Sequence, residues 1–180
     1  GNTVIVNGGS YTMTGAAGSV FRPGALTVNG GQAEVATNGG NVLAVVNSNF
    51  TLGAAGKLRM NDNDLIVDYT GASVESQVRQ YVINGRVPLS TSGIFSTPGN
   101  PDDDVVLAIA DNAAWGKTIF NNVNIDTDTV VGKYTYFGDA NLDGKVTGDD
   151  YLNVDANLGT GDSWLEGDFN MNGVTTGDDY

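Results

Sequence analysis

Val6-Asn7-Gly8-Gly9 recurs 22 residues later as Val28-Asn29-Gly30-Gly31. This repeat is the strongest indication of the fold in the sequence. A period of this length is close to one turn of a β-solenoid, in which each turn covers the apolar face of its neighbour. Asn-Gly-Gly stands again at 38–40, and Gly-Ala-Ala-Gly stands at 15–18 and 53–56. The spacing predicts about three turns within the first 70 residues, the minimum for a stable stack.

Between these glycine turns lie short segments rich in Val, Thr, Ile, Leu or Tyr, which is the composition of β-strands. The fold class is therefore mainly β. A β-sandwich or meander built on the same turns is the alternative to a solenoid, because the period is only approximate. The predicted strands are Thr3–Asn7, Ser10–Thr14, Ala25–Asn29, Ala33–Thr37, Val42–Asn47, Asn49–Leu52, Lys57–Met60 and Asp64–Tyr69.

After Tyr69 the pattern changes from strands to one amphipathic helix, predicted over residues 73–84. Ser73 stands at the N-cap position and Gly85 at the C-cap position. The residues that share one helical face between them are Val74, Val78, Tyr81 and Val82.

The following segment, Pro88 to Asp104, reads as a loop rich in Ser, Thr, Gly and Pro. Two further strands are predicted at Val105–Ala110 and Val130–Phe137, with Trp115 and Phe120 between them as core anchors. Residues 1–137 therefore form a β-rich body, and residues 138–180 form a second, smaller module.

That module contains a repeat with an offset of 29 residues. It reads D-A-N-L-D-G-K-V-T-G-D-D-Y from Asp139 to Tyr151 and D-F-N-M-N-G-V-T-T-G-D-D-Y from Asp168 to Tyr180. Each copy places oxygen-bearing side chains at positions 1, 3, 5, 9 and 12 and glycine at position 6, which is the spacing of an EF-hand-type calcium loop. Ca²⁺ needs six to eight oxygen ligands, and the glycine allows the sharp turn that wraps the chain around the ion. Two copies in register predict two Ca²⁺ sites.

The ligands follow from the loop positions, with position 7 contributing its backbone carbonyl. Position 12 is Asp in both loops, where an EF-hand usually has Glu. The first loop offers Asp139, Asn141, Asp143, the carbonyl of Lys145, Thr147 and Asp150; the second offers Asp168, Asn170, Asn172, the carbonyl of Val174, Thr176 and Asp179.

These two loops resemble the duplicated calcium segments of dockerin type I modules, over the 43 residues from Gly138 to Tyr180. The resemblance implies one helix after each loop and a cohesin-like scaffold as partner. The chain departs from that pattern in two ways. Tyr180 is already position 13 of the second loop, so the second helix is missing, and the segment after the first loop carries no Lys or Arg.

A wider stretch, from Leu58 to Tyr180, is similar to the C-terminal part of large secreted surface proteins of planctomycete-type bacteria. In those proteins autotransporter-like β repeats end in a dockerin-like calcium module. The resemblance implies an extracellular, non-catalytic architecture at the cell surface or in a matrix. The segments that carry it are Asn61-Asp-Asn-Asp-Leu-Ile-Val-Asp-Tyr-Thr, Lys133-Tyr-Thr-Tyr-Phe-Gly-Asp-Ala-Asn-Leu-Asp-Gly-Lys-Val and Gly167-Asp-Phe-Asn.

Composition removes several classes of function. The chain has no cysteine and no histidine, which excludes disulfides, thiol chemistry and histidine acid–base catalysis. Its net charge is −13, and the part from Gly138 onward holds ten acidic residues and one basic residue. Such a chain repels nucleic acids and anionic membranes, and it has no hydrophobic run that suits membrane insertion.

The leading expectation is a non-enzymatic structural protein, stabilised by calcium and assembling into a surface or matrix filament. Tyr151, Val154 and Leu158 form an apolar strip after the first loop, and the strip lacks the second helix that would cover it. A neighbouring copy is expected to cover it in a head-to-tail contact. A docking module for a cohesin-like scaffold is the alternative.

A β-helix enzyme acting on polysaccharides is the third and weakest reading. Lyases and hydrolases of that build need a base beside acidic residues or paired carboxylates on adjacent turns. The chain is therefore predicted not to be an enzyme. The few candidates in the solenoid region are Arg22, Glu34, Lys57, Arg59, Asp62, Asp64 and Asp68.

Overall fold

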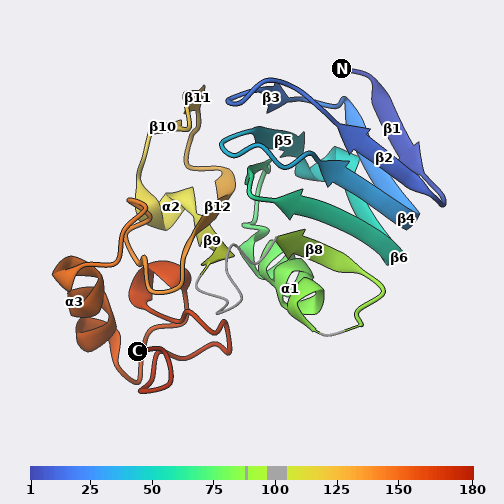
Figure 1. Cartoon of the computed structure of the whole chain (residues 1–180). Coiled ribbons are helices and arrows are strands. Elements are labelled where there is room, and N and C mark those ends of the chain that lie inside the picture. The colour runs from blue at the N-terminus through green and yellow to red at the C-terminus, as the bar shows by residue number, and fades with distance from the viewer. Residues whose placement is uncertain (88, 97–104) are drawn as a thin grey trace.

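Two mostly parallel sheets wind the first 70 residues into a short β-solenoid of about three turns, and a few helices complete a mainly β fold (Figure 1). The computed structural model describes residues 1–87, 89–96 and 105–180. In the first sheet β1 (Thr3–Val6) and β2 (Ser10–Met13) both pair with β4 (Ala25–Val35), which pairs with β6 (Phe50–Asn61), which pairs with β8 (Gly93–Ser96).

The second sheet begins with three parallel strands and ends with two antiparallel ones. Its order is β3 (Val20–Phe21), β5 (Val42–Val46), β7 (Asp64–Asp68), β12 (Thr129–Tyr136) and β9 (Val105–Asp111). The strands predicted at 105–110 and 130–137 are thus confirmed to within one residue at each end.

The strand register confirms the 22-residue period and with it the solenoid rather than the sandwich. Thr3 lies opposite Ala25, Ser10 opposite Gln32, and Val20 opposite Val42. Between the second and third turns the spacing is 24 residues at the start of β6 and 22 at β7.

Asparagine side chains repeat along the stack at corresponding places. Asn29 donates to Asn7 across 2.8 Å, the Ser19 amide donates to the Asn41 side chain across 3.1 Å, and the Asn41 amide donates to Asn63 across 3.2 Å. Each bond joins one turn to the next, and the side chains of Asn41 and Asn63 satisfy backbone amides at the corners.

Two corners differ from the prediction. The sequence predicts that the segments Asn29-Gly30-Gly31 and Gly53-Ala54-Ala55-Gly56 separate strands. Instead, β4 and β6 run through them, with a shift of register after Val28. The reason is close packing of neighbouring turns: a Cβ on Gly56 would lie 1.9 Å from the carbonyl oxygen of Val28. The glycines therefore bend a continuous strand instead of breaking it.

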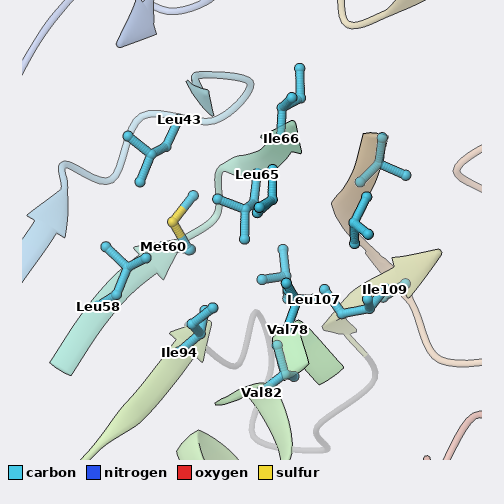
Figure 2. Close-up of a cluster of buried hydrophobic side chains, with 14 of the residues drawn as sticks. Leu43, Leu58, Met60, Leu65, Ile66, Val78, Val82, Ile94, Leu107 and Ile109 are labelled. Atoms are coloured by element: carbon cyan, nitrogen blue, oxygen red, sulfur yellow. The ribbon is translucent and has the colours of Figure 1, made fainter. Parts of the chain in front are cut away.

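Helix α1 (Glu75–Arg86) and β8 close the end of the solenoid that follows the third turn. Figure 2 shows Val78 and Val82 of α1 in the same buried cluster as Ile94 of β8 and Leu107 of β9. This confirms the predicted apolar helix face.

The ends of the helix and the loop after it differ from the prediction. Val74, not Ser73, is the N-cap residue, and the Ser73 hydroxyl accepts the Glu75 amide bond at 3.2 Å. Gly85 lies within the helix, where a Cβ would sit 1.9 Å from the carbonyl oxygen of Ile94. The predicted loop contains β8, while residues 88 and 97–104 of it lie outside the described residues.

Some of the remaining elements connect the solenoid to the C-terminal segment. Trp115 and Phe120 meet edge to face at 6.0 Å, as expected of anchors, with Phe120 buried and Trp115 half-buried. No helix in the described part of the chain has the length and apolar character needed to span a membrane. The connecting elements are α2 (Asn112–Trp115), β10 (Ile119–Phe120) and β11 (Val123–Asn124). The C-terminal segment itself contains α3 (Gly148–Asn157) and η2 (Trp164–Glu166), and η1 (Asn47–Asn49) lies within the solenoid between β5 and β6.

Candidate metal centres

The two repeated loops are fixed to the body by a small aromatic core. Trp164 of η2 is 1 % exposed, and its indole N–H donates to the carbonyl oxygen of Asp139 at 2.7 Å. Phe137, directly after β12, packs against Trp164 and Phe169 with ring centroids 6.2 and 5.6 Å away. The first loop therefore starts where a buried strand ends, without a linker.

Both loops use their first and last aspartates in the same way, which the sequence repeat predicts. In the first loop Asp139 accepts the amides of Asp143 at 3.0 Å and Gly144 at 2.9 Å. Asp150 accepts the amides of Asn141 at 3.1 Å and Thr147 at 2.8 Å. These four bonds pull the two ends of the loop together.

The second loop repeats all four bonds at the same loop positions. Asp168 accepts the amides of Asn172 and Gly173, both at 2.9 Å. Asp179 accepts the amides of Asn170 at 3.0 Å and Thr176 at 2.9 Å. The side chains at positions 3 and 5 also agree, because each accepts the amide two residues further on, at 2.8 to 3.0 Å.

The backbone turns sharply in both loops at positions 4 and 6. Gly144 and Gly173 have φ of 90° and 96°, a region that glycine enters without strain. Leu142 and Met171 at position 4 have φ of 62° and 64° and bury their side chains. The sequence predicts the glycine turn, whereas nothing in it indicates the left-handed backbone at position 4.

Burial divides the predicted ligands into two groups. Asp139, Asp150, Asp168 and Asp179 are at most 1 % exposed. The side chains at positions 3, 5, 7 and 9 lie at or near the surface: Asn141, Asp143, Lys145, Thr147, Asn170, Asn172, Val174 and Thr176.

The predicted ligands of each loop lie on one twelve-residue stretch of chain. Within the described residues, His, Cys, Asp and Glu side chains form no group of three or more arranged around a metal position. The loop carboxylates face backbone amides of their own loop instead. The donor set in each loop is all oxygen and mixes carboxylate, amide, hydroxyl and carbonyl groups, which fits a hard cation such as Ca²⁺ and does not suit a softer metal.

The loops differ in the group that holds the first aspartate from outside. Thr135 of β12 donates its hydroxyl to Asp139, whereas Arg79 of α1 forms an ion pair with Asp168. Arg79 also donates to the carbonyl oxygen of Asp162. The sequence does not point to Arg79, because 89 residues separate it from Asp168 and no local pattern connects them.

The residues weighed for an enzyme lie on both sheets. Glu34 and Arg59 are opposite each other on neighbouring strands of the first sheet, and both are bonded to Gln32. Lys57 and Arg59 lie over the ring of Phe95. Asp62 accepts the Asn38 amide at a corner.

The other candidates lie on the second sheet. Arg22 and Asp68 line a groove of about 390 Å³ between that sheet and residues 123–126. Burial, with Asp126 and Asp128 nearby, raises the pKa of Asp68. Asp64 is buried and raised in pKa to about 6 by that burial.

Comparison with known proteins adds no relative: no protein-family model matches the chain, and no curated protein or solved structure matches it. The candidate site therefore stands on the repeat and its geometry.

Proposed function

We propose that the chain is a non-enzymatic extracellular structural protein in which residues 138–180 form a dockerin-like module that binds two Ca²⁺. The observation that carries the proposal is the repetition of the same hydrogen bonds, turns and burial in two loops 29 residues apart. An ordinary Asx turn satisfies one or two amides. Here the first and last aspartates of each twelve-residue loop together accept four amides, and the second loop repeats the arrangement of the first.

Charge supports the same proposal. Asp139, Asp150, Asp168 and Asp179 are buried, and Asp168 forms an ion pair with Arg79. Burying a carboxylate without a counter-ion is costly, and backbone amides compensate only part of that cost. Two Ca²⁺ would supply four positive charges to a segment of ten acids and one base.

The solenoid supplies the structural part of the proposal. Its core is apolar and its corners are joined by asparagines, so it forms a rigid rod segment to which the loops are attached directly through β12. The proposed role of calcium is to fix the acidic module on this body, as part of a surface or matrix assembly.

The surface of α3 is the part of the module proposed to contact another copy, in a head-to-tail arrangement with the β body. The expected apolar strip is present only in part. Val154 is 1 % exposed because it packs against Gly167, while Tyr151 stacks on Tyr180 with ring centroids 6.3 Å apart. Leu152 and Leu158 remain 66 % and 46 % exposed.

Calcium binding is tested by calorimetric titration. Wild type is expected to bind two Ca²⁺, more tightly at the first loop, because its ligands include three carboxylates against two in the second. Asp150→Asn should weaken the tighter phase and Asp179→Asn the weaker one. Asp128→Asn, which removes the same charge from an exposed site outside the loops, is the control. Absence of saturable binding in wild type would refute the calcium proposal.

Self-association is tested by particle mass in calcium, for wild type and for Leu152→Asp combined with Leu158→Asp. Wild type should assemble and the double variant should not. A wild-type protein that stays monomeric, or a double variant that assembles equally well, overturns the contact through α3. A monomer that binds a cohesin-like scaffold would favour the docking alternative.

A further inference from the structure

Arg79 places a positive charge on the second loop, and the first loop has no equivalent. Its guanidinium contacts the Asp168 oxygen that also accepts the Gly173 amide. In the first loop the corresponding oxygen of Asp139 accepts the Gly144 amide and the neutral hydroxyl of Thr135. The two loops otherwise share their hydrogen bonds, so this contact is a difference of one charge at one matched atom.

The contact is part of the folded core rather than of a mobile surface. The Arg79 side chain is 16 % exposed and the Asp168 side chain is fully buried. A second bond, to the carbonyl oxygen of Asp162, fixes the guanidinium in place. Arg79 belongs to α1, which is anchored in the core by the buried Val78 and Val82, so the helix cannot rotate to withdraw it.

We propose that Arg79 is a built-in competitor of calcium at the second loop. Its guanidinium provides the counter-charge for Asp168 when no metal is bound, and it lowers the calcium affinity of that loop. The inference rests on the proposed calcium binding and adds how one of the two sites is regulated by the β body.

The physical reason is repulsion between two cations that share one carboxylate. Arginine keeps its charge at every physiological pH, so it cannot leave by losing a proton. A Ca²⁺ coordinated by Asp168 would lie within a few ångström of the guanidinium, well inside the screening length of about 8 Å at physiological salt. Burial weakens screening further, because water cannot enter between the charges.

Linkage makes the effect reciprocal. If Arg79 weakens calcium binding at the second loop, calcium at that loop weakens the Arg79 contact by the same factor. The second loop is thus attached to α1 through Arg79 without metal, and through its own ligands with metal. The first loop, held by Thr135, has no such exchange.

The test follows the amide resonances of Gly144 and Gly173 during a calcium titration, because each amide donates to the first aspartate of its own loop. The variants are Arg79→Gln, which removes the charge, and Arg79→Lys, which keeps it. Arg22→Gln removes the same charge at the far side of the solenoid, where Arg22 lines the groove beside Asp68.

In Arg79→Gln the midpoint for Gly173 should move to at least about fivefold lower calcium, the lower end of common coupling energies, while that for Gly144 stays in place. Arg79→Lys should lie close to wild type, and Arg22→Gln should change neither midpoint. An unchanged Gly144 midpoint also shows that the first loop remains folded in each variant.

Two results overturn the inference, and they are distinguishable. A Gly173 midpoint that is unchanged in Arg79→Gln, or moves to higher calcium, means that Arg79 does not compete, while calcium binding itself stands. No saturable shift of either glycine in any variant up to about 10 mM calcium, above the range of extracellular calcium modules, refutes the proposed function as well.

Discussion

Asp64 is a buried carboxylate in an environment that is unfavourable to its charge. Its side chain lies where β7, β12 and the turn between β10 and β11 meet. Burial raises its pKa to about 6, and the 2.7 Å bond from the Tyr134 amide, the charge of Lys133 and the bond from Asn121 offset only part of that rise. The ionised form is therefore less stable in the folded chain than in the unfolded one.

A raised folded-state pKa gives a defined pH dependence. The stabilising contribution is fully present below the unfolded pKa of 3.8 and is lost as the pH rises through about 6. Asp64→Asn removes that loss, because a neutral amide at the same place can still accept the Tyr134 bond. At pH 7.5 the variant should be more stable by up to about 3 kcal/mol, the equivalent of a shift of about two pKa units.

Thermal unfolding of both proteins between pH 4 and pH 7.5 measures this difference. The gap between them should narrow as the pH falls towards 4. Asp62→Asn, with the same change of charge at a half-buried corner two residues away, is the control. Equal stability of wild type and Asp64→Asn at pH 7.5 would mean that Asp64 is paired more favourably than its burial indicates.

At the scale of the elements, the continuous strands β4 and β6 depend on glycine at their bends. A Cβ on Gly56 would overlap the Val28 carbonyl of the turn above, at 1.9 Å, and backbone cannot move aside as a flexible side chain does. Gly8, at the corner after β1, has no atom within 4 Å of its virtual Cβ. Both glycines lie in glycine-rich corners of the sequence. They differ in how closely the backbone of the neighbouring turn approaches them.

Gly56→Ala should therefore lower the free energy of unfolding by at least about 2 kcal/mol, as an overpacked site does. Gly8→Ala should change it by no more than about 0.5 kcal/mol. Chemical denaturation of both variants beside wild type gives the comparison. Similar losses for the two variants would contradict the close approach of the second and third turns at Gly56.

The same elements indicate how far a sequence can be read. The 22-residue period, the helix face of α1 and the matching glycine turns of the two loops were predictable, because each is a local pattern whose meaning does not depend on distant residues. The continuity of β4 and β6 was not predictable. A glycine at a bend within a strand and a glycine in a turn between two strands look the same in the sequence. Gly85 was placed as a helix end for the same reason, although β8 packs against it.

Contacts between distant segments explain the remaining omissions. The sequence predicts a loop where β8 lies, because these four residues form a strand only by pairing with β6. Trp164 and Arg79 are central to the loops, yet the first acts through the carbonyl of Asp139 and the second through Asp168. Such contacts follow from the assembled fold and leave no spacing in the chain that could predict them.

At the scale of the whole molecule, charge and apolar burial are divided between its two parts. The loops and α3 lie beyond β9 and α2, away from the first solenoid turn (Figure 1). Residues 1–137 hold most of the apolar core, whereas residues 138–180 hold ten of the 21 acidic residues. The body should therefore be stable without metal, while the acidic segment should depend on it.

Because charge and apolar core are divided in this way, we expect calcium to stabilise residues 138–180 and to leave the solenoid unaffected. A ligand that binds only the folded form adds RT ln(1 + [L]/Kd), roughly 2.7 kcal/mol per site at a hundredfold excess over Kd. Amide exchange reports such a gain locally, because protection follows the free energy of local opening.

The most direct test is hydrogen–deuterium exchange of the whole chain, measured in saturating calcium and in chelator. We predict that calcium slows exchange throughout residues 138–180, by up to about a hundredfold at a hundredfold excess over Kd. Residues 1–70 should exchange at the same rate in both conditions. Equal exchange of residues 138–180 with and without calcium, or a change of equal size along the whole chain, would contradict the proposal that calcium selectively stabilises residues 138–180.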